Sequence, residues 1–251
     1  MLRYMKTLED YSIHAVDGEI GSVEDFYFDD ERWVVRYLVA NTGGWLSGRL
    51  VLISPISVEK VNWVDRMVHV NLTKEQVERS PDIDLRKPVS RQEETRLHAY
   101  YTWPVYWGGI GMWGGGMYPA ALATETIDED VRRRLEEQKP DRDTHLRSAR
   151  EVTGYHIQSR DDGIGHLEDF AVEDGTWALR YFIVDTRNWL PGKKVILSVR
   201  WIEKVVWEEA KVHVDLTTEG VKNAPEFNPH SPIERTYETR LHEYYDRPPY
   251  W

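Results

Sequence analysis

The stretch Ile20–Ser54 reads IGSVEDFYFDDERWVVRYLVANTGGWLSGRLVLIS, and it recurs at Ile164–Ser198 as IGHLEDFAVEDGTWALRYFIVDTRNWLPGKKVILS. The two copies align without a gap, and the match extends from Leu2–Trp107 onto Leu146–Trp251 with about two-fifths of the pairs identical. An ungapped match of this length indicates an internal duplication. A unit of about 100 residues is long enough to hold its own core. The sequence therefore predicts one domain over 1–107, a linker with a connector helix over 108–143, and a second domain over 144–251.

Each repeat has the pattern of a small, mainly β domain with short helices. About six short strands are separated by turn signals, which is typical of a small β-barrel or sandwich. The strand Trp33–Asn41 is apolar on both faces apart from Arg36, so we expect it to be buried on both sides. A short helix follows at Thr73, and Ser90–Tyr101 is predicted to be a helix that begins with a capping box of Ser90 and Glu93.

The central hairpin of each repeat predicts a structural ion pair. A two-residue turn at Asp30-Glu31, matched by the favoured pair Asp174-Gly175, would place an acid opposite an arginine on the next strand. Opposite charges directly across a strand pair are favourable. The predicted pairs are Asp25 with Arg36 and Asp169 with Arg180. The alternative interpretation is that these two arginines bind an anion.

Aromatic side chains gather in a loop and in a C-terminal tail of each repeat, HAYYTWPVYW in the first and HEYYDRPPYW in the second. Tyrosine and tryptophan are enriched at protein interfaces because they combine a large apolar area with a polar group. The residues that we predict to make protein contacts are Trp45, Trp189, Tyr100, Tyr101, Tyr106, Trp107, Tyr244, Tyr245, Tyr250 and Trp251. Three arrangements stay open: each tail packs on its own barrel, on the other unit or another chain, or on a foreign partner.

Composition excludes several classes of function. The formal net charge is −11 and cysteine is absent, which disfavours a nucleic-acid or anionic-membrane partner and excludes disulfides and thiol chemistry. The N-terminus has no apolar signal region. The uncharged segment Thr102–Thr124 is rich in glycine and poor in leucine, isoleucine and valine, so we expect no membrane insertion. These features predict a cytoplasmic protein.

No group of residues identifies a reaction, so we expect no enzyme activity and no cofactor. The string GGIGMWGGG lacks the strand–helix context of a dinucleotide site, and Gly108–Gly116 is predicted to be a flexible linker before a connector helix at Thr126–Gln138. The sharpest metal hypothesis uses a glutamate and a histidine four residues apart on one helix of each repeat. These pairs are Glu94 with His98 and Glu238 with His242; the simpler interpretation is an ordinary contact within the helix.

Several motifs together resemble the PRC-barrel domain. They are Asp17–Phe26, Arg36-Tyr37, Trp45–Gly48, Val51–Ser54 and Val68–Leu72, with a second set from Ile164 to Leu216. This family includes the cytoplasmic domain of the photosynthetic reaction-centre H subunit and the C-terminal barrel of a ribosome maturation factor. The helix with its aromatic tail looks like an extension found in bacterial stand-alone members.

The resemblance implies two tandem barrels used for protein–protein contact and assembly, with no catalytic residues. We therefore expect a non-enzymatic adaptor whose partner is a protein and whose two repeats form an internal pseudo-dimer, with further self-association left open. Two alternatives remain: a cytoplasmic assembly factor for a membrane or photosynthetic complex, and a metal-binding protein. The chain lacks the membrane helix of the H subunit, and its acidity argues against RNA.

Overall fold

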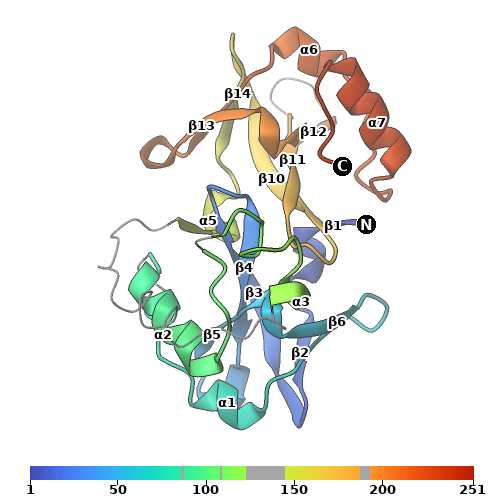
Figure 1. Cartoon of the computed structure of the whole chain (residues 1–251). Coiled ribbons are helices and arrows are strands. Elements are labelled where there is room, and N and C mark those ends of the chain that lie inside the picture. The colour runs from blue at the N-terminus through green and yellow to red at the C-terminus, as the bar shows by residue number, and fades with distance from the viewer. Residues whose placement is uncertain (86–87, 108, 123–144, 187–192) are drawn as a thin grey trace. The chain divides into compact units, whose positions relative to one another are not determined.

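The computed structural model describes residues 1–85, 88–107, 109–122, 145–186 and 193–251. Within these ranges the protein is mainly β, with short helices and two similar seven-stranded sheets (Figure 1). The first sheet runs in the order β5-β4-β3-β2-β7-β6, with β8 beside β3. The second runs in the order β12-β11-β10-β9-β14-β13, with β1 beside β10.

The strand bounds show the same succession in each repeat. The strands of the first sheet are β2 (Ser12–Ala15), β3 (Gly18–Asp29), β4 (Val34–Asn41), β5 (Leu50–Ile53), β6 (Val58–Asn62), β7 (Met67–Val70) and β8 (Leu146–Ser148). The strands of the second are β9 (His156–Gln158), β10 (Gly163–Glu173), β11 (Leu179–Asp185), β12 (Lys194–Ser198), β13 (Ile202–Val206), β14 (Lys211–Val214) and β1 (Leu2–Tyr4). Among the described strands neither sheet closes on itself, so the predicted closed barrel is not confirmed.

The first strand of each repeat pairs with the sheet of the other repeat. Strand β1 runs antiparallel to β10, as Figure 1 shows, and β8 runs antiparallel to β3. The compact units follow the sheets: a first unit of Leu8–Ala149 with Gly175–Ala178, and a second unit of Met1–Thr7, Arg150–Asp174 and Leu179–Trp251. Each unit therefore contains a strand that the sequence repeat would assign to the other.

The core of each unit is built around its two long central strands. Every residue of β4 from Val34 to Ala40 is buried, including Arg36, as its apolar pattern on both faces predicted.

The glycine of the repeated Ile-Gly motif is required because two backbone segments approach each other closely there. A Cβ on Gly21 would lie 2.0 Å from the Asn41 carbonyl oxygen, and one on Gly165 would lie 2.1 Å from that of Asp185.

The hairpin register differs from the prediction. The β3–β4 connection spans residues 30–33 and the β10–β11 connection spans residues 174–178, so neither is a two-residue turn. Trp33 and Trp177 adopt left-handed backbone conformations in these loops, with φ of 55° and 61°. Irregularities in both ladders shift the pairing further, and Asp25 lies opposite Val39 while Asp169 lies opposite Ile183.

The predicted ion pairs are consequently wrong in their acidic partners. Arg36 pairs with Asp29 at 2.9 Å, and Arg180 pairs with Glu173 at 2.5 Å. Each acid precedes its arginine by seven positions and ends the preceding strand, so the longer loop and the bulges bring it beside the guanidinium. Asp25 instead accepts a hydrogen bond from the Ser148 hydroxyl of β8, and Asp169 accepts one from the Lys6 backbone.

Short helices complete each unit. The helices are α1 (Lys74–Glu78), α2 (Arg91–Tyr101), α3 (Pro119–Leu122), α5 (Ala149–Val152), α6 (Thr218–Lys222) and α7 (Arg235–Tyr244). The predicted capping box at Ser90 and Glu93 is confirmed, and Thr73 caps α1 in the same way. The predicted connector helix at 126–138 lies outside the described residues. No helix in the described ranges is long and apolar enough to cross a membrane.

Candidate interaction surface

The aromatic tails differ in how far they are buried. Tyr101 and Tyr106 are buried, whereas Trp251 keeps 49% of its surface exposed. Tyr100 and Tyr244 lie at matching positions and are both largely exposed, while their hydroxyls donate to backbone carbonyls of α1 and α6. The remaining tail residues of intermediate exposure are Trp107, Tyr245 and Tyr250. The Trp45 side chain and Trp189 lie outside the described part of the chain.

A buried polar cluster attaches α2 to the first sheet. The Tyr37 hydroxyl on β4 lies 3.0 Å from Glu94 Oε1 and 2.9 Å from His98 Nε2. Tyr106 from the tail donates to the same Glu94 oxygen at 2.5 Å, and Arg91 lies 2.7 Å from the other. The glutamate and histidine that the sequence analysis singled out therefore meet two tyrosines and an arginine.

The number of protons in this cluster limits its charge states. His98 Nδ1 lies 2.9 Å from the Pro104 carbonyl oxygen, so Nδ1 carries a proton and donates there. Tyr37 has one hydroxyl proton and can donate to only one of Glu94 and His98. Burial raises the pKa of Glu94, against the opposing effect of Arg91, and burial lowers the pKa of His98 to about 3.

The second unit repeats the tyrosine, glutamate and histidine contacts of this cluster. The Tyr181 hydroxyl lies 3.0 Å from both Glu238 Oε1 and His242 Nε2, and Tyr250 donates to Glu238 at 2.7 Å. Arg235 lies 3.2 Å from the same carboxylate. Burial raises the pKa of Tyr250 and lowers that of His242. The matching geometry shows that the spacing of glutamate and histidine places both groups against a sheet tyrosine.

The metal hypothesis lacks a third ligand at these positions. No group of three or more histidine, aspartate or glutamate side chains that could hold a metal ion occurs in the described ranges. In both units the carboxylate and the imidazole already contact tyrosine hydroxyls. The geometry is that of a polar contact that orients a helix on a sheet.

An arginine lies under the aromatic tail of each unit. The guanidinium carbon of Arg36 lies 3.9 Å from the centre of the Tyr106 ring, and that of Arg180 lies 4.1 Å from the Tyr250 ring. Such stacking is favourable because the ring face carries partial negative charge. In each case the neighbouring acid accepts from Nε and Nη2 of the arginine. The third guanidinium nitrogen, Nη1, does not contact the acid.

In the first unit a glycine-rich hairpin covers this arginine and its tyrosine. We call residues 109–116 the cover hairpin. Gly111 and Trp113 donate to the carbonyls of Gly114 and Gly116 at 2.8 and 2.9 Å. A Cβ on Gly109 or Gly111 would lie 2.1 or 2.3 Å from the opposing backbone, so the hairpin requires glycine there. The predicted flexible linker is therefore wrong for 109–116, because these residues fold back on the first unit.

Contacts to the two arginines of the first repeat hold the cover hairpin in place. Arg36 Nη1 donates to the Met112 carbonyl at 2.6 Å, and Arg32 donates to the carbonyls of Gly109 and Gly111. The Trp113 side chain is fully buried, with its ring 4.8 Å from the Arg36 guanidinium carbon. As a result Arg36 is fully buried and Tyr106 keeps 2% of its surface exposed.

The matching surface of the second unit is more open. We define the Arg180 face as Arg180, Arg235, Tyr250 and Trp251. Arg235 stacks on Trp251 at 4.0 Å, and Trp251 also lines a depression beside α7 with His242 and Arg247. Among the described residues, none lies on Arg180 as Met112 and Trp113 lie on Arg36. The Arg180 side chain is 9% exposed, whereas the Arg36 side chain is 0% exposed.

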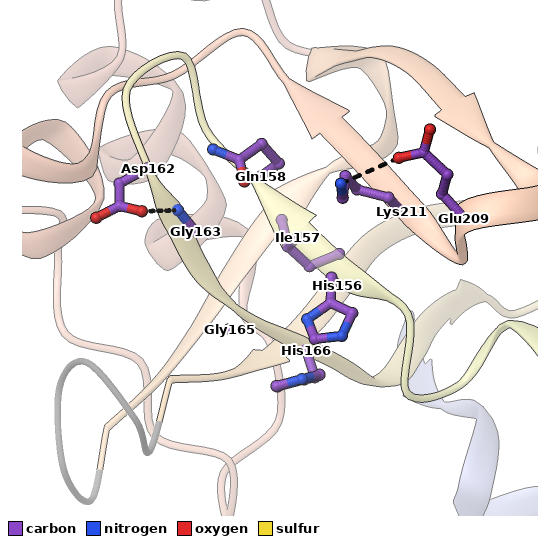
Figure 2. A pocket seen from close by; sticks show the side chains of 9 residues that line it. All are labelled: His156, Ile157, Gln158, Asp162, Gly163, Gly165, His166, Glu209 and Lys211. Carbon is purple, nitrogen blue, oxygen red and sulfur yellow. Dashed lines mark hydrogen bonds and ion pairs between the residues drawn. The ribbon is translucent and has the colours of Figure 1, made fainter.

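A second depression of the second unit contains a histidine pair that the sequence analysis did not single out. His156 on β9 and His166 on β10 are direct cross-strand partners, and their ring centres lie 4.3 Å apart (Figure 2). Beside them Lys211 pairs with Glu209 at 3.1 Å. The pair could not be found from sequence because the two histidines are ten positions apart and meet only through the β9–β10 ladder.

Comparison with protein families gives one match. Residues 3–77, from β1 through most of α1, match the family model of the PRC-barrel domain. The predicted resemblance is thereby confirmed, and the two similar sheets are consistent with a tandem arrangement of PRC-barrel repeats. No match was found among curated proteins. PRC-barrel domains are a non-catalytic family, and a domain of this kind suggests a protein-interaction or assembly module.

Proposed function

We propose that this protein is a non-enzymatic interaction or assembly module and that the Arg180 face of the second unit is its partner-binding surface. The observation that carries the proposal is the difference between the two repeats. Arg36 and Tyr106 lie beneath a hairpin in the first unit, with 0% and 2% of their surface exposed, whereas in the second unit Tyr250 and Trp251 stay partly exposed beside the buried Arg180. Exposed aromatic side chains next to arginine are the composition that interface centres favour.

The interior of the second unit supports a binding role for this face. Tyr250 donates to Glu238 of α7 at 2.7 Å, and Glu238 and His242 each contact the Tyr181 hydroxyl on the sheet at 3.0 Å. A tail held in this way presents its rings in one orientation, which lowers the entropy lost on binding. The PRC-barrel match supports the same class of function.

Site-specific photo-crosslinking tests the proposal. A benzophenone amino acid is placed at position 251 of the full chain, and at Val64 in a matched control, since Val64 is 90% exposed but lies outside any aromatic cluster. After irradiation in cells of the native host, we expect a discrete protein adduct from position 251 that Val64 does not give. Adducts that are absent, or identical from the two positions, would contradict the proposed surface.

A further inference from the structure

The cover hairpin shows what kind of segment fits on an arginine–tyrosine face of this protein. This inference rests on the proposed function, because it names the chemistry of the partner. In the first unit the segment that covers Arg36 and Tyr106 is the cover hairpin, a glycine-rich backbone with one tryptophan. The backbone offers a carbonyl to Arg36 Nη1 at 2.6 Å, and the indole packs against the guanidinium 4.8 Å away.

Arg180 repeats the contacts that Arg36 makes with its acid and its tyrosine, whereas Thr176 stands at the position of Arg32 in the second repeat. Glu173 accepts from its Nε at 3.1 Å and from its Nη2 at 2.5 Å, just as Asp29 accepts from Nε and Nη2 of Arg36. Tyr250 lies 4.1 Å from the Arg180 guanidinium carbon, as Tyr106 lies 3.9 Å from that of Arg36. The difference lies at Nη1: that of Arg36 donates to a carbonyl, and that of Arg180 contacts no acceptor within the described part of the chain.

The charge of this face, and the close backbone packing within the cover hairpin, favour an uncharged, glycine-rich ligand. Glu173 pairs with Arg180 and Glu238 pairs with Arg235, so the two arginines of this face already have acidic partners, whereas a backbone carbonyl needs only the N–H donors of Arg180 Nη1. The cover hairpin approaches its arginines through glycine, where any Cβ would meet opposing backbone. A segment with side chains at these positions could not adopt the same hairpin.

We propose that the Arg180 face binds a glycine-rich segment of a partner protein that carries a tryptophan, in the manner of the cover hairpin on Arg36. The partner's backbone carbonyl accepts from Arg180 Nη1, and its indole packs over the guanidinium beside Tyr250. Trp251, which is 49% exposed, borders the segment and loses its exposure on binding.

A peptide titration on the full chain tests this proposal. The probe is the fluorescein-labelled peptide GGIGMWGGG, which copies residues 108–116, and its binding is followed by anisotropy. We expect saturable binding that weakens at least tenfold when the peptide tryptophan is replaced by alanine. We also expect a loss of roughly tenfold or more in Arg180→Lys, because the single lysine nitrogen cannot lie both beside Glu173 and at the position of Nη1, and because lysine lacks the planar guanidinium on which the indole stacks.

Two controls make the outcome decisive. Arg160→Lys alters an exposed arginine of the same unit that pairs with Asp215, and it should leave the affinity unchanged. Circular dichroism of each variant confirms folding, and Tyr250→Leu provides a second variant if Arg180→Lys unfolds. Affinity that is unmeasurable for the folded wild type, or equal for Arg180→Lys and Arg160→Lys, would overturn the proposal.

Two further measurements distinguish a second copy of this chain from a foreign partner, and a failure of this proposal from a failure of the proposed function. Dimers in analytical ultracentrifugation that vanish in both Trp113→Ala and Arg180→Lys would show that a second copy supplies the segment, and would overturn a foreign partner. If the peptide fails while position 251 still crosslinks to a discrete protein, the interaction function stands and only the glycine–tryptophan chemistry is wrong.

Discussion

Replacing Tyr37 by phenylalanine removes one hydroxyl from the centre of the buried cluster. The Tyr37 ring is fully buried, and it keeps its packing in the variant. The lost oxygen lies 3.0 Å from Glu94 Oε1 and 2.9 Å from His98 Nε2. Glu94 retains Tyr106 and Arg91 as partners, so the group left without a hydrogen bond is His98 Nε2.

The magnitude follows from that single unsatisfied group. Leaving a buried acceptor without its donor costs about 1–3 kcal/mol, and no cavity larger than one oxygen adds to the cost. We expect Tyr37→Phe to lower the free energy of unfolding of the first unit by about 2 kcal/mol. Tyr181→Phe should lower that of the second unit by a similar amount, since its hydroxyl lies 3.0 Å from both Glu238 and His242.

Urea unfolding followed by tryptophan fluorescence and circular dichroism measures these changes. The matched control is Tyr100→Phe, whose hydroxyl donates to the Gln76 carbonyl at the surface, and it should change stability by less than about 0.5 kcal/mol. The two sheets need not unfold together, so each variant should shift the transition of its own unit. Equal effects of Tyr37→Phe and Tyr100→Phe would refute the bridging role of the Tyr37 hydroxyl.

Three further predictions concern the register, the buried histidine and the exchanged strand. Asp29→Ala should lower the free energy of unfolding by about 3–5 kcal/mol because it leaves Arg36 buried without its acid, whereas Asp25→Ala should lower it markedly less. Equal losses in urea unfolding would contradict the pairing of Arg36 with Asp29. His98 should stay neutral in the folded protein down to a pKa of about 3, so its stabilising contribution is complete above the unfolded pKa of about 6.5 and falls as pH drops from there towards 3. An NMR titration of its ring proton checks this, and a midpoint near 6.5 would contradict it. Deleting residues 1–7 should destabilise the second unit, which loses β1, more than the first. Residue-resolved hydrogen exchange should then show faster exchange of the backbone amides of β10. An equal increase in the exchange rate of the β3 amides would contradict the strand assignment.

Local sequence patterns predicted the elements of this protein well. The capping box of Ser90 and Glu93 needs only residues three apart, and the burial of β4 needs only that both of its faces are apolar, so both could be deduced without tertiary information. The spacing of Glu94 and His98 correctly indicated two side chains on one helix face. It could not show that Tyr37, from a strand far away in sequence, would meet them both.

The predicted register of the central hairpins was wrong for a physical reason. An Asp-Gly pair is a strong two-residue turn signal, but Trp33 and Trp177 adopt positive φ in longer loops, and bulges shift the ladder. One shifted position changes which acid faces the arginine. The prediction of a flexible linker at the cover hairpin was wrong for a similar reason. A glycine-rich composition is shared by flexible linkers and by close-packed backbones, and only the contacts with Arg36 and Arg32 distinguish the two.

The duplication, the mainly β character, the starts of α1 and α2 and the resemblance of residues 3–77 to the PRC-barrel domain could be deduced from the sequence alone, because each depends on neighbours in the chain or on direct comparison of sequences. The tertiary structure was needed to show that β1 and β8 pair with the sheets of the opposite repeats, and that a hairpin covers one arginine–tyrosine face while the tyrosine of its counterpart stays partly exposed. Those outcomes depend on contacts between distant segments. Two repeats with the same local preferences can exchange a strand, or differ in what lies over a shared face, without any change in those preferences.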